Sequence, residues 1–257
     1  MKAAPKEIQS LAQILFSQGF GTRRLVAALI ASGEVRVDGQ VCDDPAQTWP
    51  VEGLVFEVRS QAWHYQASAL VLLHKPVGYE CSAKPRHHPS VLGLLPAPLR
   101  ERGVQPVGRL DADTSGLLLL SDDGPLIHRL TSPKHHVHKV YEVDCKHALA
   151  ADSVARLLSG VVLDDDPTPV QALACSATCS HTLRMTLTEG RYHQVKRMVA
   201  AIGNRVETLH RSRFGPWVLP ADLAPGQWRW VNVADLPAPA KAAPPASAPP
   251  DSSIARG

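Results

Sequence analysis

Four consecutive leucines, Leu117–Leu120, follow directly on a polar loop that carries two aspartates and an arginine. An uninterrupted apolar run bounded by turn residues is typical of a strand that is buried on both faces. The loop side chains Arg109, Asp111 and Asp113 therefore lie at the mouth of a rigid, buried element. A chain of 257 residues, of which 44% are hydrophobic, is long enough to bury such a core.

Apolar patterns elsewhere in the chain predict the rest of this domain. Further strand patterns cover residues 70–73, 140–143 and 183–187. One helix near the end has an apolar stripe over 195–202, and Gly203 stops it. Several strands with fewer helices predict an α+β domain over 69–236, built on a mixed or antiparallel sheet rather than a doubly wound one.

The first sixty residues, 1–60, predict a small α/β module of their own. One helix is expected over Ile8–Phe16 and a second over Arg23–Ser32, which Thr22 caps. The residues expected on the core side of the second helix are Leu25, Ala28, Leu29 and Ser32. Alternating valines around an Asp-Gly pair predict a hairpin over Glu34–Val41.

Two segments are predicted to lie outside these domains. Residues 61–68 are expected to be a linker. Residues 237–257 consist mostly of Pro, Ala and Ser, and they hold too few large apolar residues to offset the entropy lost on ordering. We therefore expect 237–257 to form a disordered tail.

Charge and composition exclude several classes of protein. The net charge is +3 and the pI about 8.6, so binding to a polyanion would need local clusters of Lys and Arg. No long apolar stretch predicts a membrane span, and the first ten residues lack the apolar core of a signal peptide. Five scattered cysteines are typical of reduced thiols, which predicts a cytoplasmic protein.

Three stretches carry side chains suited to chemistry, each with an ordinary structural alternative. In 108–116, Asp111 and Asp113 are either turn formers or a carboxylate pair for acid–base work. In 189–198, cationic residues with interleaved Tyr and His suit a phosphate backbone, but they also suit a solvated helix face. Tyr141 begins a strand and points either into the core or into a cleft.

These three stretches, in this order, resemble the bacterial rRNA pseudouridine synthases. They read Gly-Arg-Leu-Asp-x-Asp-Thr-Ser-Gly-Leu, Lys-x-Tyr-x-Val and Glu-Gly-Arg-x-His-Gln-Val-Lys-Arg-Met. The stretch from Leu72 to Tyr79 is similar to the family's opening strand and loop, with His74 where an Asn is usual. The first sixty residues resemble an S4 RNA-binding module. The likeness covers nearly all of the chain except the tail, and it is greatest to the branch that modifies small-subunit rRNA.

The resemblance implies a role for each matching residue. Asp111 takes the place of the catalytic aspartate, and Tyr141 that of a tyrosine packed on the target uracil. Lys196 takes the place of the basic residue that pairs with the aspartate and keeps it ionised. Arg109 takes the place of an arginine near the space left by the flipped nucleotide. The carboxylate reaches the sugar either by attacking C1′ or by taking a proton from C2′.

The same resemblance sets the expected partners. The residues expected to bind RNA are Arg23, Arg24, Arg36, Arg191, His193, Arg197, Arg211 and Arg213. The expected substrate is one uridine of 16S rRNA at the U516-type site, within a ribosomal subunit precursor. The alternative is a site in 23S rRNA. The reaction oxidises nothing and adds no group, so we expect neither a cofactor nor a metal. We also expect a monomer that does not bind membranes.

Competing interpretations rest on isolated features. A binding protein without chemistry would lack Asp111 or Tyr141, and both are present. A metalloprotein is suggested by the side chains of His87, His88, His135, His136, His138, Cys175 and Cys179, but the cysteines have no second pair at zinc-finger spacing. A hydrolase could use Asp111 with Asp113. A dinucleotide enzyme is disfavoured because no Gly-x-Gly-x-x-Gly motif follows a strand.

Overall fold

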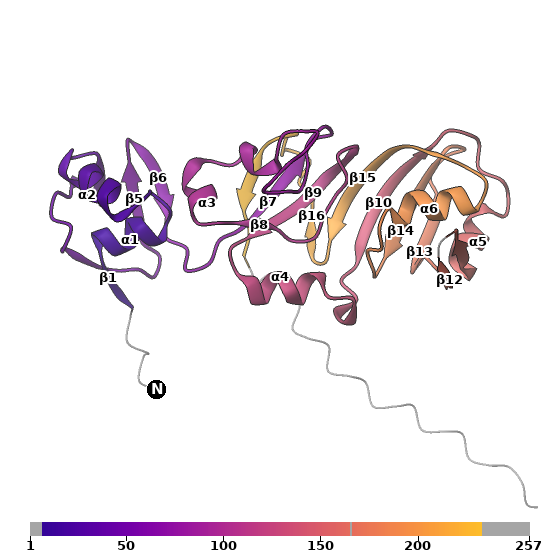
Figure 1. Cartoon of the computed structure of the whole chain (residues 1–257), viewed down its shortest axis with the longest axis horizontal. Coiled ribbons are helices and arrows are strands. Elements are labelled where there is room, and N and C mark those ends of the chain that lie inside the picture. Colours follow the sequence, from indigo (N-terminus) through magenta and orange to yellow (C-terminus); the bar gives the residue numbers. More distant parts are fainter. Residues whose placement is uncertain (1–6, 165, 233–257) are drawn as a thin grey trace, which may run out of the picture.

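The computed structural model describes residues 7–164 and 166–232, and the predicted tail at 237–257 lies outside the described residues. Figure 1 shows an elongated molecule with a small N-terminal module at one end and a large sheet domain that reaches the other. The sheets are mixed or antiparallel and the helices are short, so the predicted α+β class is confirmed. In the described part of the chain, no helix is long and apolar enough to cross a bilayer.

The N-terminal module packs two helices against short strands. Its elements are β1 (Ile8–Ser10), α1 (Leu11–Ser17), α2 (Arg23–Ala31), β2 (Val35–Val37), β3 (Gln40–Val41), β4 (Thr48–Pro50), β5 (Val55–Val58) and β6 (Gln61–His64). Strands β3-β2-β5-β6 form one sheet, and β1 pairs with β4. The predicted hairpin at Asp38-Gly39 is confirmed, with both turn residues at positive φ, as a two-residue turn requires.

Three details of the module differ from the prediction. The helix expected from Ile8 begins only at Leu11, because 8–10 pair with β4 as a strand and Ser10 caps the helix. On α2, the buried residues are Val26 and Ile30, whereas Leu25 is 60% exposed. Half of the expected linker is also structured, because residues 61–64 form β6 against β5.

The large domain is built on a nine-stranded sheet. Its central path runs β13-β14-β10-β15-β9-β7-β17, with β16 and β8 paired at its side. These strands are β7 (Leu70–Lys75), β8 (Gln105–Pro106), β9 (Thr114–Ser121), β10 (Lys139–Cys145), β13 (Ala174–Ala177), β14 (Thr182–Leu187), β15 (Val206–Phe214), β16 (Trp217–Val218) and β17 (Trp228–Trp230). Only the pair β9–β15 is parallel among the described pairings of this sheet.

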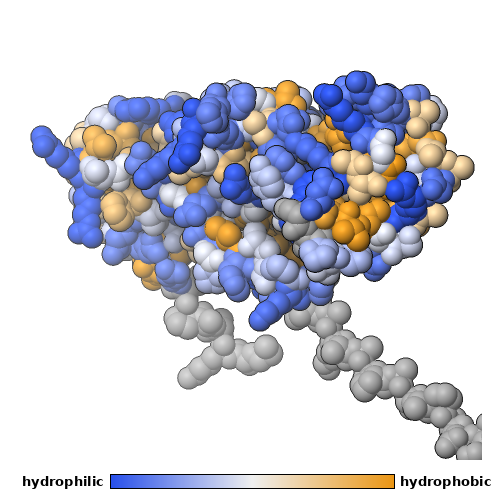
Figure 2. Space-filling view, turned by 45° about the vertical axis from the view of Figure 1, so that its right-hand side comes forward, coloured by the Kyte–Doolittle hydropathy of each residue, from blue (hydrophilic) through white to orange (hydrophobic). Residues whose placement is uncertain are grey.

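Short helices and a small second sheet surround this framework. They are η1 (Val91–Leu94), α3 (Ala97–Glu101), α4 (Gly124–Thr131), η2 (Pro133–His135), α5 (Ser153–Ser159), β11 (Val161–Leu163), β12 (Asp166–Val170) and α6 (Gln194–Ala201). The stripe predicted for α6 is confirmed, since Val195, Met198 and Val199 are buried. On the face shown in Figure 2, hydrophilic residues cover most of the surface and hydrophobic ones form separate patches.

The predicted leucine strand carries core on both faces. In β9, Leu118 and Leu120 belong to the larger apolar cluster, which also contains the buried side of α6. Leu117 and Leu119 belong to a second cluster on the other face, which α4 covers. All four leucines have no exposed surface, so β9 is a rigid support for the loop that precedes it.

Gly116 allows β9 and β15 to approach each other closely. Its φ is 110°, and a Cβ placed there would lie 2.6 Å from the backbone nitrogen of Arg211. Residues 114–116 pair in parallel with 209–211 at this point. A glycine is therefore required where the two strands meet.

Polar contacts tie the N-terminal module to the sheet domain. Arg102, just after α3, pairs with Asp122 at 2.7 Å and donates to the side chain of Gln18 at 2.9 Å. The same guanidinium donates to the carbonyl of Gln66 at 3.0 Å. The arginine side chain is only 4% exposed, so it links the module, the connecting segment and the start of α4 in one buried network.

Candidate active site

The backbone of the loop before β9 is held by a buried lysine. Lys75 ends β7 and has no exposed surface. Its ammonium donates to the carbonyls of Asp111 at 3.0 Å and Thr114 at 2.7 Å, and to that of Pro76 at 3.0 Å. Burial lowers the pKa of Lys75, and the nearby acidic groups oppose that effect. A charge at the end of an apolar strand thus fixes the peptide groups around Asp111.

The carboxylate of Asp111 lies between two side chains of the 193–196 segment. Lys196 donates to its Oδ2 at 3.2 Å, and Nε2 of His193 lies 3.3 Å from its Oδ1. The side chain is 34% exposed, so the carboxylate is accessible at a cavity rim. Asp111 and Lys196, 85 positions apart, therefore meet as the resemblance implied.

Lys196 is shared between two carboxylates. It also contacts Asp113, at 2.6 and 2.9 Å, and Asp113 is 71% exposed. Burial opposes ionisation of both groups, but their hydrogen bond and charges outweigh it. The pKa of Asp113 is lowered and that of Lys196 is raised as a result. The ammonium therefore remains a cation beside Asp111 at neutral pH.

The loop before α6 places His193 and Lys196. The side chain of Gln194 is buried. It accepts a hydrogen bond from the backbone N–H of Arg191 at 2.9 Å and donates one to Glu189 at 2.9 Å. His193 takes a left-handed conformation as the residue before the helix, and its ring stacks on Tyr192 with centroids 3.8 Å apart. His193, which was predicted only to bind RNA, thus also contacts Asp111.

Tyr141 is a wall of the cavity beside Asp111. It lies on β10, is 8% exposed and belongs to the larger apolar cluster. The cavity has a volume of about 90 Å³, and Arg109, Leu110, Asp111 and Lys196 line it as well. Both predicted locations of Tyr141, core and cleft, are thus occupied by one side chain.

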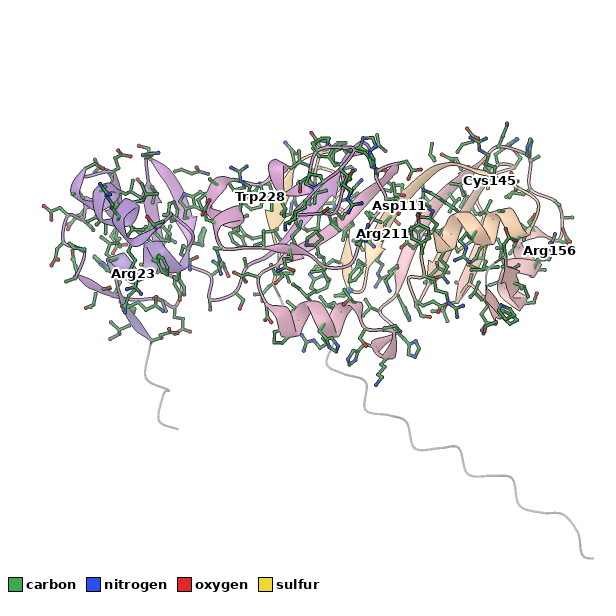
Figure 3. The ribbon with its side chains drawn as sticks, in the orientation of Figure 1. Arg23, Asp111, Cys145, Arg156, Arg211 and Trp228 are labelled. Atoms are coloured by element: carbon green, nitrogen blue, oxygen red, sulfur yellow. The ribbon has the colours of Figure 1, made fainter. Side chains whose placement is uncertain are left out.

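The residues predicted to bind RNA fall into two groups. Arg23, Arg24, Arg36 and Arg213 are exposed, and the first three lie on the N-terminal module. Arg191 and His193 line the cavity beside Asp111, Arg197 donates to the carbonyl of Tyr192 at 3.1 Å, and Arg211 is only 2% exposed. Figure 3 shows Arg23 at one end of the molecule and Asp111 and Arg211 in its middle.

The role of Lys75 was not predicted from the sequence, although the residue lies in the family-like stretch from Leu72 to Tyr79. The available signal was a lysine that follows five mostly apolar residues in a buried strand, because a buried ammonium requires partners. Among the described residues, no group of three or more His, Cys, Asp or Glu side chains is arranged to hold a metal ion. The histidines and cysteines considered for a metal are therefore not gathered into a site there.

Known proteins match this chain along both parts. The profile of the S4 domain matches residues 9–50, and that of RNA pseudouridylate synthase matches 69–201. The ribosomal small subunit pseudouridine synthase A of Yersinia pestis is 40% identical over 222 residues, which cover 86% of this chain and 94% of that protein. The protein of the same name from Escherichia coli K12 is 38% identical over 222 residues, 86% of this chain and 95% of that one.

A solved structure gives the same result for the fold. The crystal structure of a pseudouridylate synthase superposes with a TM-score of 0.62 at 30% identity, and it covers 88% of this chain and 97% of its own. Asp111, Tyr141 and Lys196 all lie within the residues that the synthase profile matches. With its S4 domain in front, the chain belongs to the RNA pseudouridylate synthase family.

Proposed function

We propose that this protein converts one uridine of small-subunit rRNA to pseudouridine, at the U516-type site of 16S rRNA. The observation that carries the proposal is the carboxylate of Asp111 at the rim of a small cavity, 3.2 Å from the ammonium of Lys196 and beside the Tyr141 ring. The named relatives act on the small ribosomal subunit. The substrate is the rRNA of a subunit precursor, and the enzyme acts in the cytoplasm as a monomer.

The reaction needs only a carboxylate and a held base. The N1–C1′ bond breaks, the uracil turns, and C5 bonds to C1′; C5 loses a proton and N1 gains one. Atoms and electrons balance without a cofactor. Asp111 acts on the sugar, and Lys196 supplies the positive charge beside it. These roles suit their positions, because a group that reacts at the sugar must reach out of the wall of the cavity.

Tyr141 and Arg109 handle the flipped nucleotide. The target base has to leave its stack before the sugar is accessible, and an aromatic side chain can hold it. Tyr141 is fixed by the core on one side and lines the cavity on the other, so its ring stacks on the uracil. Arg109 is exposed at the same cavity and enters the space that the nucleotide leaves.

The two parts of the chain divide the work. The N-terminal module, which β6 extends to His64, contacts the RNA backbone through Arg23, Arg24 and Arg36. Arg191, His193, Arg197 and Arg213 contact RNA around the cleft of the catalytic domain. Phosphate contacts fix register and orientation, whereas the cleft selects the nucleotide.

Mapping pseudouridine across the rRNA of a strain that lacks this protein tests the proposal. The expected result is the loss of one modified position from small-subunit rRNA, restored by the wild-type gene but not by Asp111→Asn. Loss of a 23S rRNA position instead would assign the enzyme to a large-subunit site. An unchanged map would contradict the proposed function.

A further inference from the structure

A second, larger cavity adjoins the one that contains Asp111. Its volume is about 290 Å³, and it shares the walls formed by Arg109, Tyr141 and Arg191 with the smaller cavity. From there it extends toward Lys139 and Arg211, which the smaller cavity does not touch, and Asp111 is not part of its lining. The larger cavity is therefore a neighbouring chamber, not the place of the reacting carboxylate.

Arg211 lines this chamber, and its guanidinium is only partly satisfied by hydrogen bonds. The residue is 2% exposed, its Nε donates to the carbonyl of Leu117 at 2.9 Å, and its guanidinium lies 5.0 Å from the ring centre of Phe214. One terminal nitrogen, Nη2, is buried without a hydrogen-bond partner. Buried charged donors are normally satisfied, so this one lacks an acceptor that a bound group would supply.

Lys139 brings a second cation to the same chamber. Its ammonium donates to the carbonyls of Val137 at 2.8 Å and Thr188 at 3.4 Å, and it lies 5.6 Å from the ring centre of Phe214. Burial lowers the pKa of Lys139 to about 8, the charge of Arg211 adds to this, and Glu189 opposes it. The buried Arg211 and the half-buried Lys139 thus repel each other at this chamber.

The acidic residue of the lining does not neutralise this pair. Glu189 is engaged by Arg191, at 3.2 Å, and by the amide of Gln194, at 2.9 Å. Arg109 and Arg191 add positive charge to the chamber walls. The chamber therefore carries an excess of positive charge in a place where solvent screens little.

We propose that the larger cavity is a phosphate subsite, which holds the backbone phosphate next to the uridine bound beside Asp111. A phosphodiester carries one negative charge and oxygen acceptors for both the guanidinium of Arg211 and the ammonium of Lys139. A nucleotide that flips out turns about its own backbone, so an adjacent phosphate moves with it into the cleft. The two cavities meet at Tyr141, which separates the base from the phosphate. This inference rests on the proposed function.

The test uses short RNAs that contain the mapped uridine and one uncharged methylphosphonate linkage at a time. We expect one linkage next to the target uridine to weaken wild-type binding by roughly 10-fold to 100-fold, the range of a buried charge-assisted contact. In Arg211→Met, binding is already weaker, and the same linkage changes it by less than about twofold. Filter binding at fixed salt gives both values.

Arg205→Met is the matched control. Arg205 directly precedes β15, which carries Arg211, but its side chain is 72% exposed and pairs with Glu207. Its loss should leave the response to the critical linkage as in the wild type. If Arg211→Met responds to that linkage as strongly as the wild type does, the subsite is refuted. The absence of any sensitive linkage beside the target uridine has the same meaning.

Two further measurements keep the result interpretable. If Arg211→Met does not fold, as judged by its melting curve, Lys139→Met takes its place with the same expected loss of linkage sensitivity. Inorganic phosphate, compared with chloride at equal ionic strength, separates the two sources of a phosphate group. A rise in melting temperature with inorganic phosphate but no linkage effect would overturn the assignment to RNA. Failure of the wild type to modify unsubstituted RNA would instead count against the proposed function.

Discussion

The N-terminal module and the cleft of the sheet domain both carry cations, but they hold them in opposite ways. In the module, Arg23, Arg24 and Arg36 are exposed on short elements. Beneath and beside the cleft, Lys75 and Arg211 are almost completely buried, and backbone carbonyls hold each of them. Solvent and salt screen the attraction between an exposed cation and an anionic ligand, so one exposed cation can replace another. A buried cation acts at one defined position. Under the proposed function, the module therefore provides affinity for RNA, and the cleft provides the geometry of the reaction.

The largest effect on the cleft alone is expected for Asp111→Asn. This substitution keeps the shape of the side chain and removes its charge. We expect the rate of pseudouridine formation to fall by a factor of roughly 10⁴ or more, because the carboxylate has no substitute. RNA binding should survive, since phosphate affinity depends on Lys and Arg elsewhere. Tritium release from C5-labelled uridine measures the rate, and filter binding measures the affinity.

Asp113→Asn is the control for that substitution. Asp113 shares Lys196 with Asp111 but is much more exposed, so its loss should reduce the rate far less. An Asp111→Asn enzyme with near wild-type turnover would refute the mechanism. A collapsed melting curve together with loss of both activity and binding would instead make Asp111 a structural turn residue.

A second prediction concerns the buried support of the loop. Lys75→Met removes the donor shared by several carbonyls, so we expect the free energy of unfolding to fall by about 2–3 kcal/mol. Urea denaturation of the purified protein measures the change. Lys84→Met, in an exposed position of the following loop, should change the free energy by less than about 0.5 kcal/mol. Equal effects of the two variants would mean that Lys75 does not support the loop.

The module is tested by changing Arg23, Arg24 and Arg36 together to Gln. Each lost phosphate contact lowers the slope of log affinity against log salt by roughly 0.7 to 0.9, so the triple variant should show a much flatter dependence. The value of kcat at saturating RNA should remain that of the wild type, because these residues lie on α2 and β2 of the N-terminal module, whereas Asp111 lies in the sheet domain. An unchanged slope would remove the module from the RNA contact surface.

The smallest expected effect is a pH dependence of RNA binding. Folding lowers the pKa of Lys139 from 10.5 to about 8, mainly through burial. Stability therefore rises with pH between about 8 and 10.5, as the unfavourable buried charge is lost. A phosphate needs that charge, so wild-type RNA affinity should fall up to roughly tenfold as pH rises through 8. Binding titrations should show a weaker dependence for Lys139→Met, and the same dependence would contradict the assignment.

Local signals in the sequence predicted the elements that depend on few neighbours. The Asp38-Gly39 turn, the leucine strand and the stripe of α6 are confirmed because each pattern determines its own conformation. The strand at Ile8–Ser10 was not predicted, since its partner lies about forty positions later. The hairpin that includes β6 turns at Arg59-Ser60, two residues at positive φ without the usual Asn or Gly.

The same distinction applies to the site. The resemblance brought Asp111, Tyr141 and Lys196 together, because their motifs are specific. It did not show the burial of Arg211, which was expected only to bind RNA. Nor did it show that Lys75 binds the loop carbonyls, because those contacts involve backbone atoms, which have no sequence signature.

Gly116 links the two walls of the cleft mechanically. It lies on β9, the strand that follows the Asp111 loop, and it pairs with Arg211 on β15, where the two backbones leave no room for a methyl group. Any side chain there would push the walls apart and change the width of the cleft, although the residue lies at neither cavity. In a library of random variants selected for RNA modification, position 116 should therefore tolerate substitution as poorly as position 111.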